Sequence, residues 1–146
     1  MEILTDSTSP RQERLAGAIL AILGFLTLAI GLYFSFFRPA MLPEDIRFTG
    51  IDQSQLTSRM SEWLLIVFHT WGGFVIAFGI LMIGAAAYLA TARAHYLRWG
   101  ITLGVLCAFG RFLLSNLAIH SDSVGFVGLL FALAVFAAVR LSLPRA

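Results

Sequence analysis

The sequence predicts an all-α integral membrane protein, a bundle of four transmembrane helices that forms a single domain over residues 1–146. Hydrophobic residues make up 59% of the chain and charged residues 12%, whereas about a quarter of the residues of a soluble protein are charged. A helix that crosses the hydrocarbon core needs about 20 mostly apolar residues. Four stretches satisfy that requirement, residues 15–37, 63–90, 99–119 and 123–141.

The first apolar stretch is long enough for a helix of about 34 Å. Ser9, Pro10 and Gln12 match an N-cap, a proline at the first helical position and a capping-box glutamine, so we expect the helix to begin ahead of the membrane. Pro39 and Pro43 should end it on the far side. The length of the apolar run and the acidic residues ahead of it favour a membrane anchor over a cleaved signal peptide.

The outer loop, residues 38–62, precedes the second helix. Asp52 and Gln55 have the spacing of a second capping box, with Ile51 and Leu56 as its hydrophobic staple. We therefore expect this helix to begin near Gln53 and to stand above the membrane before it enters. The later connections are short, which predicts antiparallel packing of the second helix with the third and of the third with the fourth.

Arginine positions predict the orientation of the bundle, because cytoplasmic loops carry an excess of basic residues. The outer loop holds three arginines; the opposite side holds Arg11, Arg14, Arg93, Arg98, Arg140 and Arg145. Both termini are therefore expected in the cytoplasm, and the outer loop outside it. All ten basic residues are arginine, a composition typical of a GC-rich bacterial genome, so we expect a bacterial inner membrane.

Small residues recur at spacings that let helices approach closely in lipid. They predict helix-packing faces at Gly17, Gly24, Gly31, Gly73, Gly100, Gly104, Ala108 and Gly128. These faces either close the four-helix bundle or form a homo-oligomer interface.

Arg111 is the one charged residue in the interior of the predicted spans, since Arg140 lies at the end of the fourth. An arginine near mid-membrane costs roughly 2.5–3.5 kcal/mol on insertion scales, so it must face the bundle, a partner or water. It shares a helix face with Gly104, Ala108 and Ser115, which predicts that it points inward. Two interpretations stay open: an internal ion pair with Glu62 or a loop acid, or the floor of a polar pocket.

The strongly polar residues of the spans gather in the outer half of the bundle. We hypothesise a binding pocket that opens to the outer side, with Arg111 and His69 as its floor and Glu62 and Asn116 at its rim. Glu44 and Asp45 of the long loop would fold over it as a lid.

No metal site or cofactor is expected. A transmembrane haem needs two histidines at similar depth, and His95 and His120 are both expected at depths different from that of His69. His69 and Glu62 alone lack the further ligands that zinc requires. The single cysteine, Cys107, lies in an apolar stretch without a base at helical spacing. The basic charge is too dilute for nucleic acid.

Two short motifs carry a resemblance. Residues 68–73 read Phe-His-Thr-Trp-Gly-Gly, and a Gly110-Arg111 pair lies in the third span. From the second helix onward the chain is similar to small bacterial four-helix membrane proteins loosely grouped with the DoxX-like families. The resemblance implies the same four-span fold and no particular activity, and the outer loop here is longer than that group implies.

Three classes of function remain. The preferred one is a small binding or accessory subunit that associates with the lipid bilayer and a larger membrane complex, or that holds an amphiphile in the outer pocket. The second is a small oligomeric transporter, against which stands the lack of polar residues in the inner half. The third is a membrane-embedded enzyme that uses Glu62, His69 and Arg111 on a lipid or quinone-like substrate. The missing catalytic set favours a protein that is not an enzyme.

Overall fold

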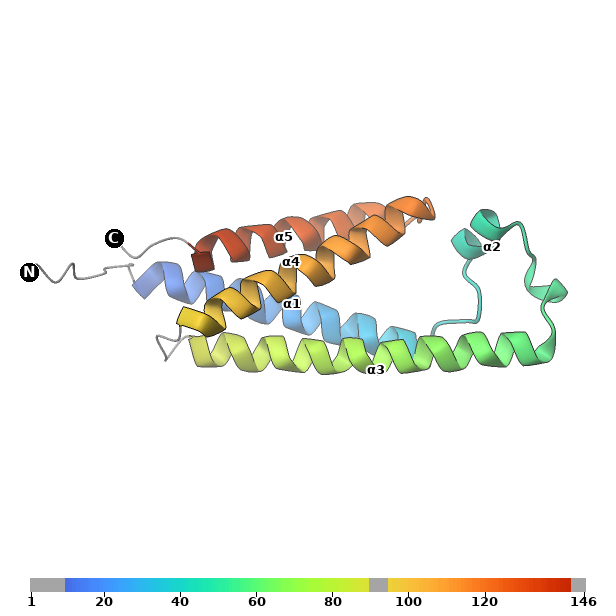
Figure 1. Cartoon of the computed structure of the whole chain (residues 1–146), viewed down its shortest axis with the longest axis horizontal. Helices are drawn as coiled ribbons and strands as arrows, with labels where there is room; N and C mark the ends of the chain where they lie inside the picture. Colours follow the sequence, from blue (N-terminus) through green and yellow to red (C-terminus); the bar gives the residue numbers. More distant parts are fainter. Residues whose placement is uncertain (1–9, 90–94, 143–146) are drawn as a thin grey trace, which may run out of the picture.

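A computed structural model describes residues 10–89 and 95–142 of the chain. Within these residues the fold is all-α (Figure 1). The helices are α1 (Pro10–Phe36), α2 (Pro43–Thr49), α3 (Ser58–Leu89), α4 (His95–Ala118) and α5 (Val124–Ser142), with a 3₁₀ turn, η1 (Gln53–Gln55), ahead of α3. Four helices are long and apolar enough to cross a membrane. This confirms the predicted fold class and the predicted number of spans.

The outer loop differs from the prediction because it contains a helix of its own. Pro43, expected to stop the first helix, is the first residue of α2, whose first turn is acidic. The backbone N–H of Leu42 donates to Asp45 at 2.8 Å, which caps the helix. Gly50 ends α2 with a φ of 68°, a left-handed conformation that glycine adopts without steric cost.

The second capping box forms, but the predicted start of the second long helix near Gln53 is wrong. Asp52 accepts the backbone N–H of Ser54 at 2.8 Å, and its own N–H donates to Gln55 at 2.8 Å. The hydrogen bond from the Ser54 N–H holds the pKa of Asp52 below its usual value. The carboxylate therefore stays ionised, and continues to cap this segment, at a lower pH than an ordinary aspartate would. The capped segment is limited to the 3₁₀ turn η1, because the backbone adopts an extended conformation at Leu56. Helix α3 begins at Ser58.

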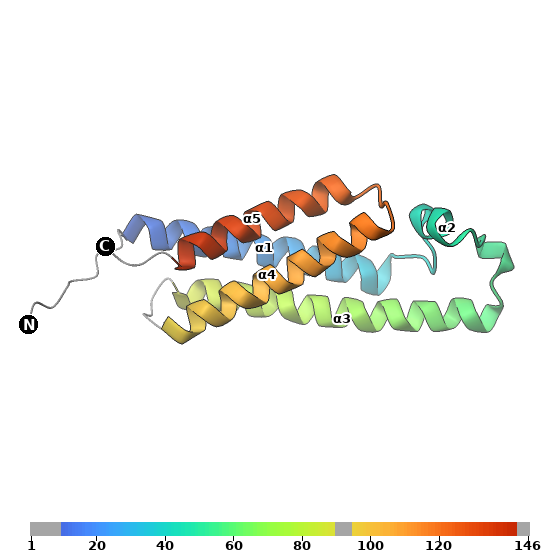
Figure 2. The ribbon, with the colours of Figure 1, turned by 45° about the horizontal axis from the view of Figure 1, so that its top comes forward.

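The four long helices form two pairs. Helix α1 packs along α3, α4 packs along α5, and α1 and α5 join the pairs. The predicted packing of α4 with α5 is therefore confirmed. The predicted packing of α3 with α4 is wrong over most of the length of these helices. They lie close to one another near their connection and diverge toward the end of the bundle that carries α2 (Figures 1 and 2).

Glycines let α1 and α3 approach closely. A Cβ atom added at Gly31 of α1 would lie 2.6 Å from the Ile76 nitrogen, and one at Gly79 of α3 would lie 2.7 Å from the Leu28 nitrogen. A Cβ atom added at Gly24 of α1 would lie 2.8 Å from the Ile83 side chain. These contacts are to backbone or to branched side chains, so the two helices touch over a stripe with seven-residue spacing. Gly17 lies at the loose end of this stripe, where an added Cβ would be 3.5 Å from the Ala86 oxygen.

Other predicted packing positions have open space beside them. In the described part of the chain, no atom lies within 4 Å of a Cβ added at Gly73, Gly100, Gly104 or Gly128. Ala108 is also exposed. Helix α4 instead buries larger residues at helical spacing, Thr102, Val105, Phe109 and Asn116, because side-chain volume fills the wider gap at this interface. The faces predicted at Gly73, Gly100, Gly104, Ala108 and Gly128 therefore do not close the bundle.

The apolar surface of the chain is largely uncovered. Leu20, Leu23 and Leu130 form the fully buried centre of the core. Large side chains on all four long helices are exposed, among them Phe25, Phe74, Leu103 and Leu129. Only 11% of the most apolar window of α3 is buried within the chain. Such a surface is characteristic of helices that face lipid rather than water.

Candidate functional site

A cavity of about 1140 Å³ lies between α3 and α4, where these helices diverge. Its back wall comes from α1 and α5, and the segment from Arg38 to Asp45 lines the α2 end. Away from α2 the lining is mostly apolar and aromatic, with Leu26, Ile30, Val75, Phe78 and Phe109. Its polar and charged lining residues are Thr27, Tyr33, Arg38, Glu44, Asp45, Arg111, Ser115, Asn116 and Ser123. The cavity is therefore amphiphilic along its length.

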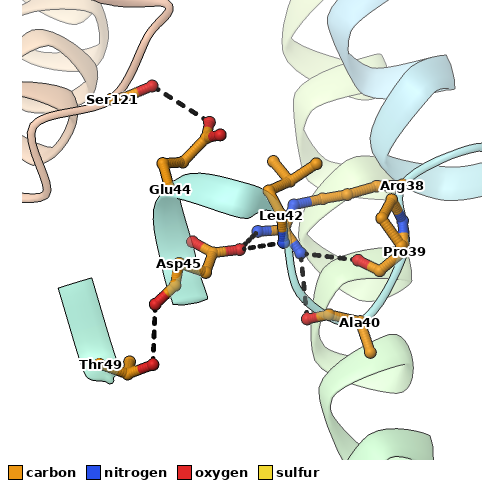
Figure 3. Close-up of polar contacts among 8 residues, drawn as sticks. All are labelled: Arg38, Pro39, Ala40, Leu42, Glu44, Asp45, Thr49 and Ser121. Atoms are coloured by element: carbon orange, nitrogen blue, oxygen red, sulfur yellow. Dashed lines mark hydrogen bonds and ion pairs between the residues drawn. The ribbon is translucent and has the colours of Figure 1, made fainter. Parts of the chain in front are cut away.

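Arg38 is the best-buried charged residue at the α2 end, with 6% of its surface exposed. Its guanidinium contacts the Asp45 carboxylate at 2.6 Å and donates to the Pro39 carbonyl oxygen at 3.0 Å (Figure 3). The guanidinium carbon also lies 3.4 Å from the centroid of the Phe68 ring, a cation–π contact with α3. Arg38 thus connects the end of α1 with both α2 and α3.

Sequence reasoning missed this role and used Arg38 only to orient the helices. A local signal exists, because Asp45 follows seven residues later and Phe34 precedes by one helical turn, and both contact Arg38. The contact with Phe68, thirty positions away, has no such local signal.

Helix α2 is bound on one side to the end of α1 and on the other side to the turn between α4 and α5. Asp45 binds Arg38 beside α1, while Glu44 accepts a hydrogen bond from the Ser121 hydroxyl, at 3.2 Å, in the turn between α4 and α5 (Figure 3). Arg47 pairs with Asp122 of the same turn at 2.8 Å. The hydrogen bond and charge of Asp122 raise the pKa of Arg47. Glu44 and Asp45 both line the cavity, so this helix covers its α2 end.

Arg111 lines the cavity from α4. Among residues 10–89 and 95–142 no acid pairs with its guanidinium, because the ion pairs found there join Arg38 to Asp45 and Arg47 to Asp122. The internal ion pair considered from the sequence is thus not formed within these residues. The backbone carbonyl of Arg111 accepts the Ser115 hydroxyl at 3.0 Å. Unlike Arg38, Arg111 is an exposed residue.

Asn116 and three aromatic rings line the same cavity as Arg111. Asn116 is buried and donates its side-chain amide to the Phe112 carbonyl at 2.9 Å, which leaves its amide oxygen free to accept. The Trp71 ring lies 6.1 Å from Phe112 and 4.5 Å from Phe34, centroid to centroid. These rings narrow the cavity between α3 and α4 and give it flat apolar walls.

His69 and Glu62 do not lie with the other predicted site residues. Both are exposed and neither lines the cavity. Helix α3 turns Val67, Phe68 and Trp71 toward the cavity, and at about 100° per residue His69 points at least about 100° away from each of them. The beginning of α3 also extends past the end of α1 (Figure 1). The structure thus brings Arg111, Asn116, Glu44 and Asp45 to one cavity and leaves His69 and Glu62 outside it.

No three His, Cys, Asp or Glu side chains in the described ranges are grouped closely enough to hold a metal ion. Cys107 is a free, exposed thiol on α4.

The fold and the cavity together define a class: all-helical proteins with four helices able to span a membrane and an amphiphilic cavity between two of them. Comparisons of the chain with protein-family models, with curated proteins and with solved structures give no match. The resemblance to the DoxX-like families therefore stays a prediction.

Proposed function

We propose that the protein is an integral membrane binding protein that holds one amphiphilic molecule in the cavity between α3 and α4. The apolar chain of that molecule lies between Leu26, Val75 and Phe109, and its polar end lies toward α2. In this proposal both termini are cytoplasmic, the membrane is the bacterial inner membrane, and α2 covers the extracytoplasmic end.

The observation that carries the proposal is the change in polarity along the cavity. Away from α2 the lining is mostly apolar and aromatic, with Arg111 among these residues, whereas Arg38, Glu44 and Asp45 lie together at the α2 end. A ligand made of a hydrocarbon chain and a polar head matches both parts at once. A purely polar or purely apolar ligand would leave one of them without suitable contacts.

The size of the cavity also supports an occupant. Protein interiors are close-packed, with few voids larger than a water molecule, and small-molecule pockets have volumes of about 300–1,000 Å³. At about 1140 Å³ this cavity is slightly larger than that range. An apolar space of this volume is stabilised when hydrocarbon fills it, because its walls gain dispersion contacts that a void does not provide.

The position of His69 and Glu62 argues against the enzyme hypothesis built on them. Proton transfer requires acid and base groups within hydrogen-bond reach of one substrate. Both side chains lie outside the lining to which Arg111 belongs, so binding without chemistry is the function that the cavity supports best.

Filling the cavity is expected to remove the bound molecule. Ala108 lines the cavity, whereas its neighbour Cys107 is exposed and does not. In Ala108→Phe the new ring occupies cavity space, so we expect about tenfold less co-purifying amphiphile. Native mass spectrometry of the protein released from membranes, followed by lipid extraction, measures this amount.

Cys107→Phe is the matched control, because it adds a ring of similar size one position away without entering the cavity. It should retain the wild-type amount of amphiphile. If wild-type protein carries no amphiphile, or if the two variants lose it equally, the proposed function is wrong.

A further inference from the structure

We infer that the bound amphiphile has an anionic head group, a carboxylate or a phosphate, that pairs with Arg111. This inference rests on the proposed function and adds the chemical class of the ligand. It follows from which of the charged side chains that line the cavity already have a partner of opposite charge.

Four charged side chains line the cavity, Arg38, Arg111, Glu44 and Asp45. Arg38 and Asp45 neutralise one another at 2.6 Å. Glu44 accepts the Ser121 hydroxyl in the turn between α4 and α5 (Figure 3) and keeps its negative charge, which also interacts with Arg47. Arg111 is left as the charge that no acid of the described residues compensates.

The place of Arg111 along α4 makes its unpaired charge significant. Arg111 lies seven residues before Ala118, the last residue of α4, which is about 10 Å along the helix axis. It is therefore well inside the span Leu97–Ala118. An arginine at such a depth is unfavourable unless it meets water or an anion. Hydrogen bonds from a guanidinium to a carboxylate or phosphate are short, strong and often bidentate, so an anionic head group removes this cost.

The neighbours of Arg111 also suit an anion. The Ser115 hydroxyl, one turn further along α4, also lines the cavity, and it would donate to an anion by giving up its bond to the Arg111 carbonyl oxygen. The ring of Phe112, the residue after Arg111, lies 6.1 Å from the Trp71 ring of α3. Aromatic surface of this kind is less polar than water, and charge-assisted bonds are stronger in less polar surroundings. In this arrangement the head group lies deeper than the head groups of the surrounding bilayer.

The test uses the full-length protein in phosphatidylcholine nanodiscs and four bromine-labelled C16 probes: hexadecanoate, hexadecyl phosphate, hexadecanol and hexadecyltrimethylammonium. Bromine quenches tryptophan, and Trp71 lines the cavity while Trp63 and Trp99 do not. The wild type should bind both anionic probes at least about tenfold more tightly than the alcohol, and the cation most weakly. A preference for one of the two anions distinguishes a fatty-acid from a phosphate source.

Arg111→Gln should reduce the preference for anions over the alcohol to about twofold or less, while binding of the alcohol is unchanged and shows that the variant folds. Arg111→Lys should retain part of the preference. Arg59→Gln removes an exposed arginine outside the cavity and should retain all of it.

Two results separate the inference from the proposed function. If the alcohol and the anions bind equally to the wild type, or if Arg111→Gln retains the wild-type preference, the anionic class is wrong and the binding function stands. If none of the probes binds to the wild type, the binding function fails.

Discussion

Replacing Arg38 by glutamine is expected to lower the free energy of unfolding by about 3–5 kcal/mol, because the change leaves a partly buried carboxylate without its partner. The guanidinium side chain is 4% exposed and that of Asp45 is 22% exposed, so water cannot replace the lost charge. The variant also loses the contact with Phe68 and the bond to the Pro39 carbonyl. Unfolding in mixed micelles, followed by circular dichroism, measures the change.

Arg47→Gln is the matched control, since it breaks the neighbouring ion pair with Asp122, whose side chains are 55% and 69% exposed. Solvent screens this pair, and its loss should leave the unfolding curve unchanged. Equal stability of the two variants would mean that Arg38 has no structural role at the end of α1.

Replacing Gly79 by alanine is expected to lower the free energy of unfolding by about 1–3 kcal/mol. The added Cβ would lie 2.7 Å from the Leu28 nitrogen and 2.8 Å from the Gly24 oxygen. Both are backbone atoms and cannot rotate away, so α1 and α3 must separate along their whole stripe. Helix association in lipid depends on such close contact.

Gly73→Ala on the same helix is the control, because the described structure offers open space beside Gly73. Alanine is the better helix former, so stability should stay the same or rise by up to about 1 kcal/mol. The same micelle unfolding assay compares the two. A loss in Gly73→Ala as large as in Gly79→Ala would show that another surface covers this face of α3.

The spans were predictable because their length and apolar character are local properties of the sequence. Local signals also placed the start of α1 at Pro10 and the capping box at Asp52. They did not reveal where α3 begins, since a capping box fits a 3₁₀ turn as well as a long helix. Nor did they separate Gly72 and Gly79, which face α1, from Gly73, because the choice depends on the rotation of α3 against a distant helix.

The candidate site was predictable only in part. Arg111 and Asn116 share one helix, and the cost of a charge in lipid indicated that Arg111 turns inward. Arg111 and His69 are both exposed, but only Arg111 lines the cavity, because the rotation of α3 that turns Phe68 and Trp71 toward the cavity depends on how α3 packs against α1. Arg38 escaped notice because its burial depends on Phe68 of α3 and on the path of the loop that follows Pro39.

The divergence of α3 from α4 has a consequence for how a ligand arrives. Helix α2 is bound to α1 on one side and to the α4–α5 turn on the other, which obstructs the route from the aqueous phase. The interface between α3 and α4 is not closely packed over most of its length. In a membrane it would open laterally to the acyl chains of the surrounding lipids. Molecules that partition into a leaflet would therefore reach the cavity by lateral diffusion, and occupancy would follow their mole fraction among lipids rather than their concentration in water.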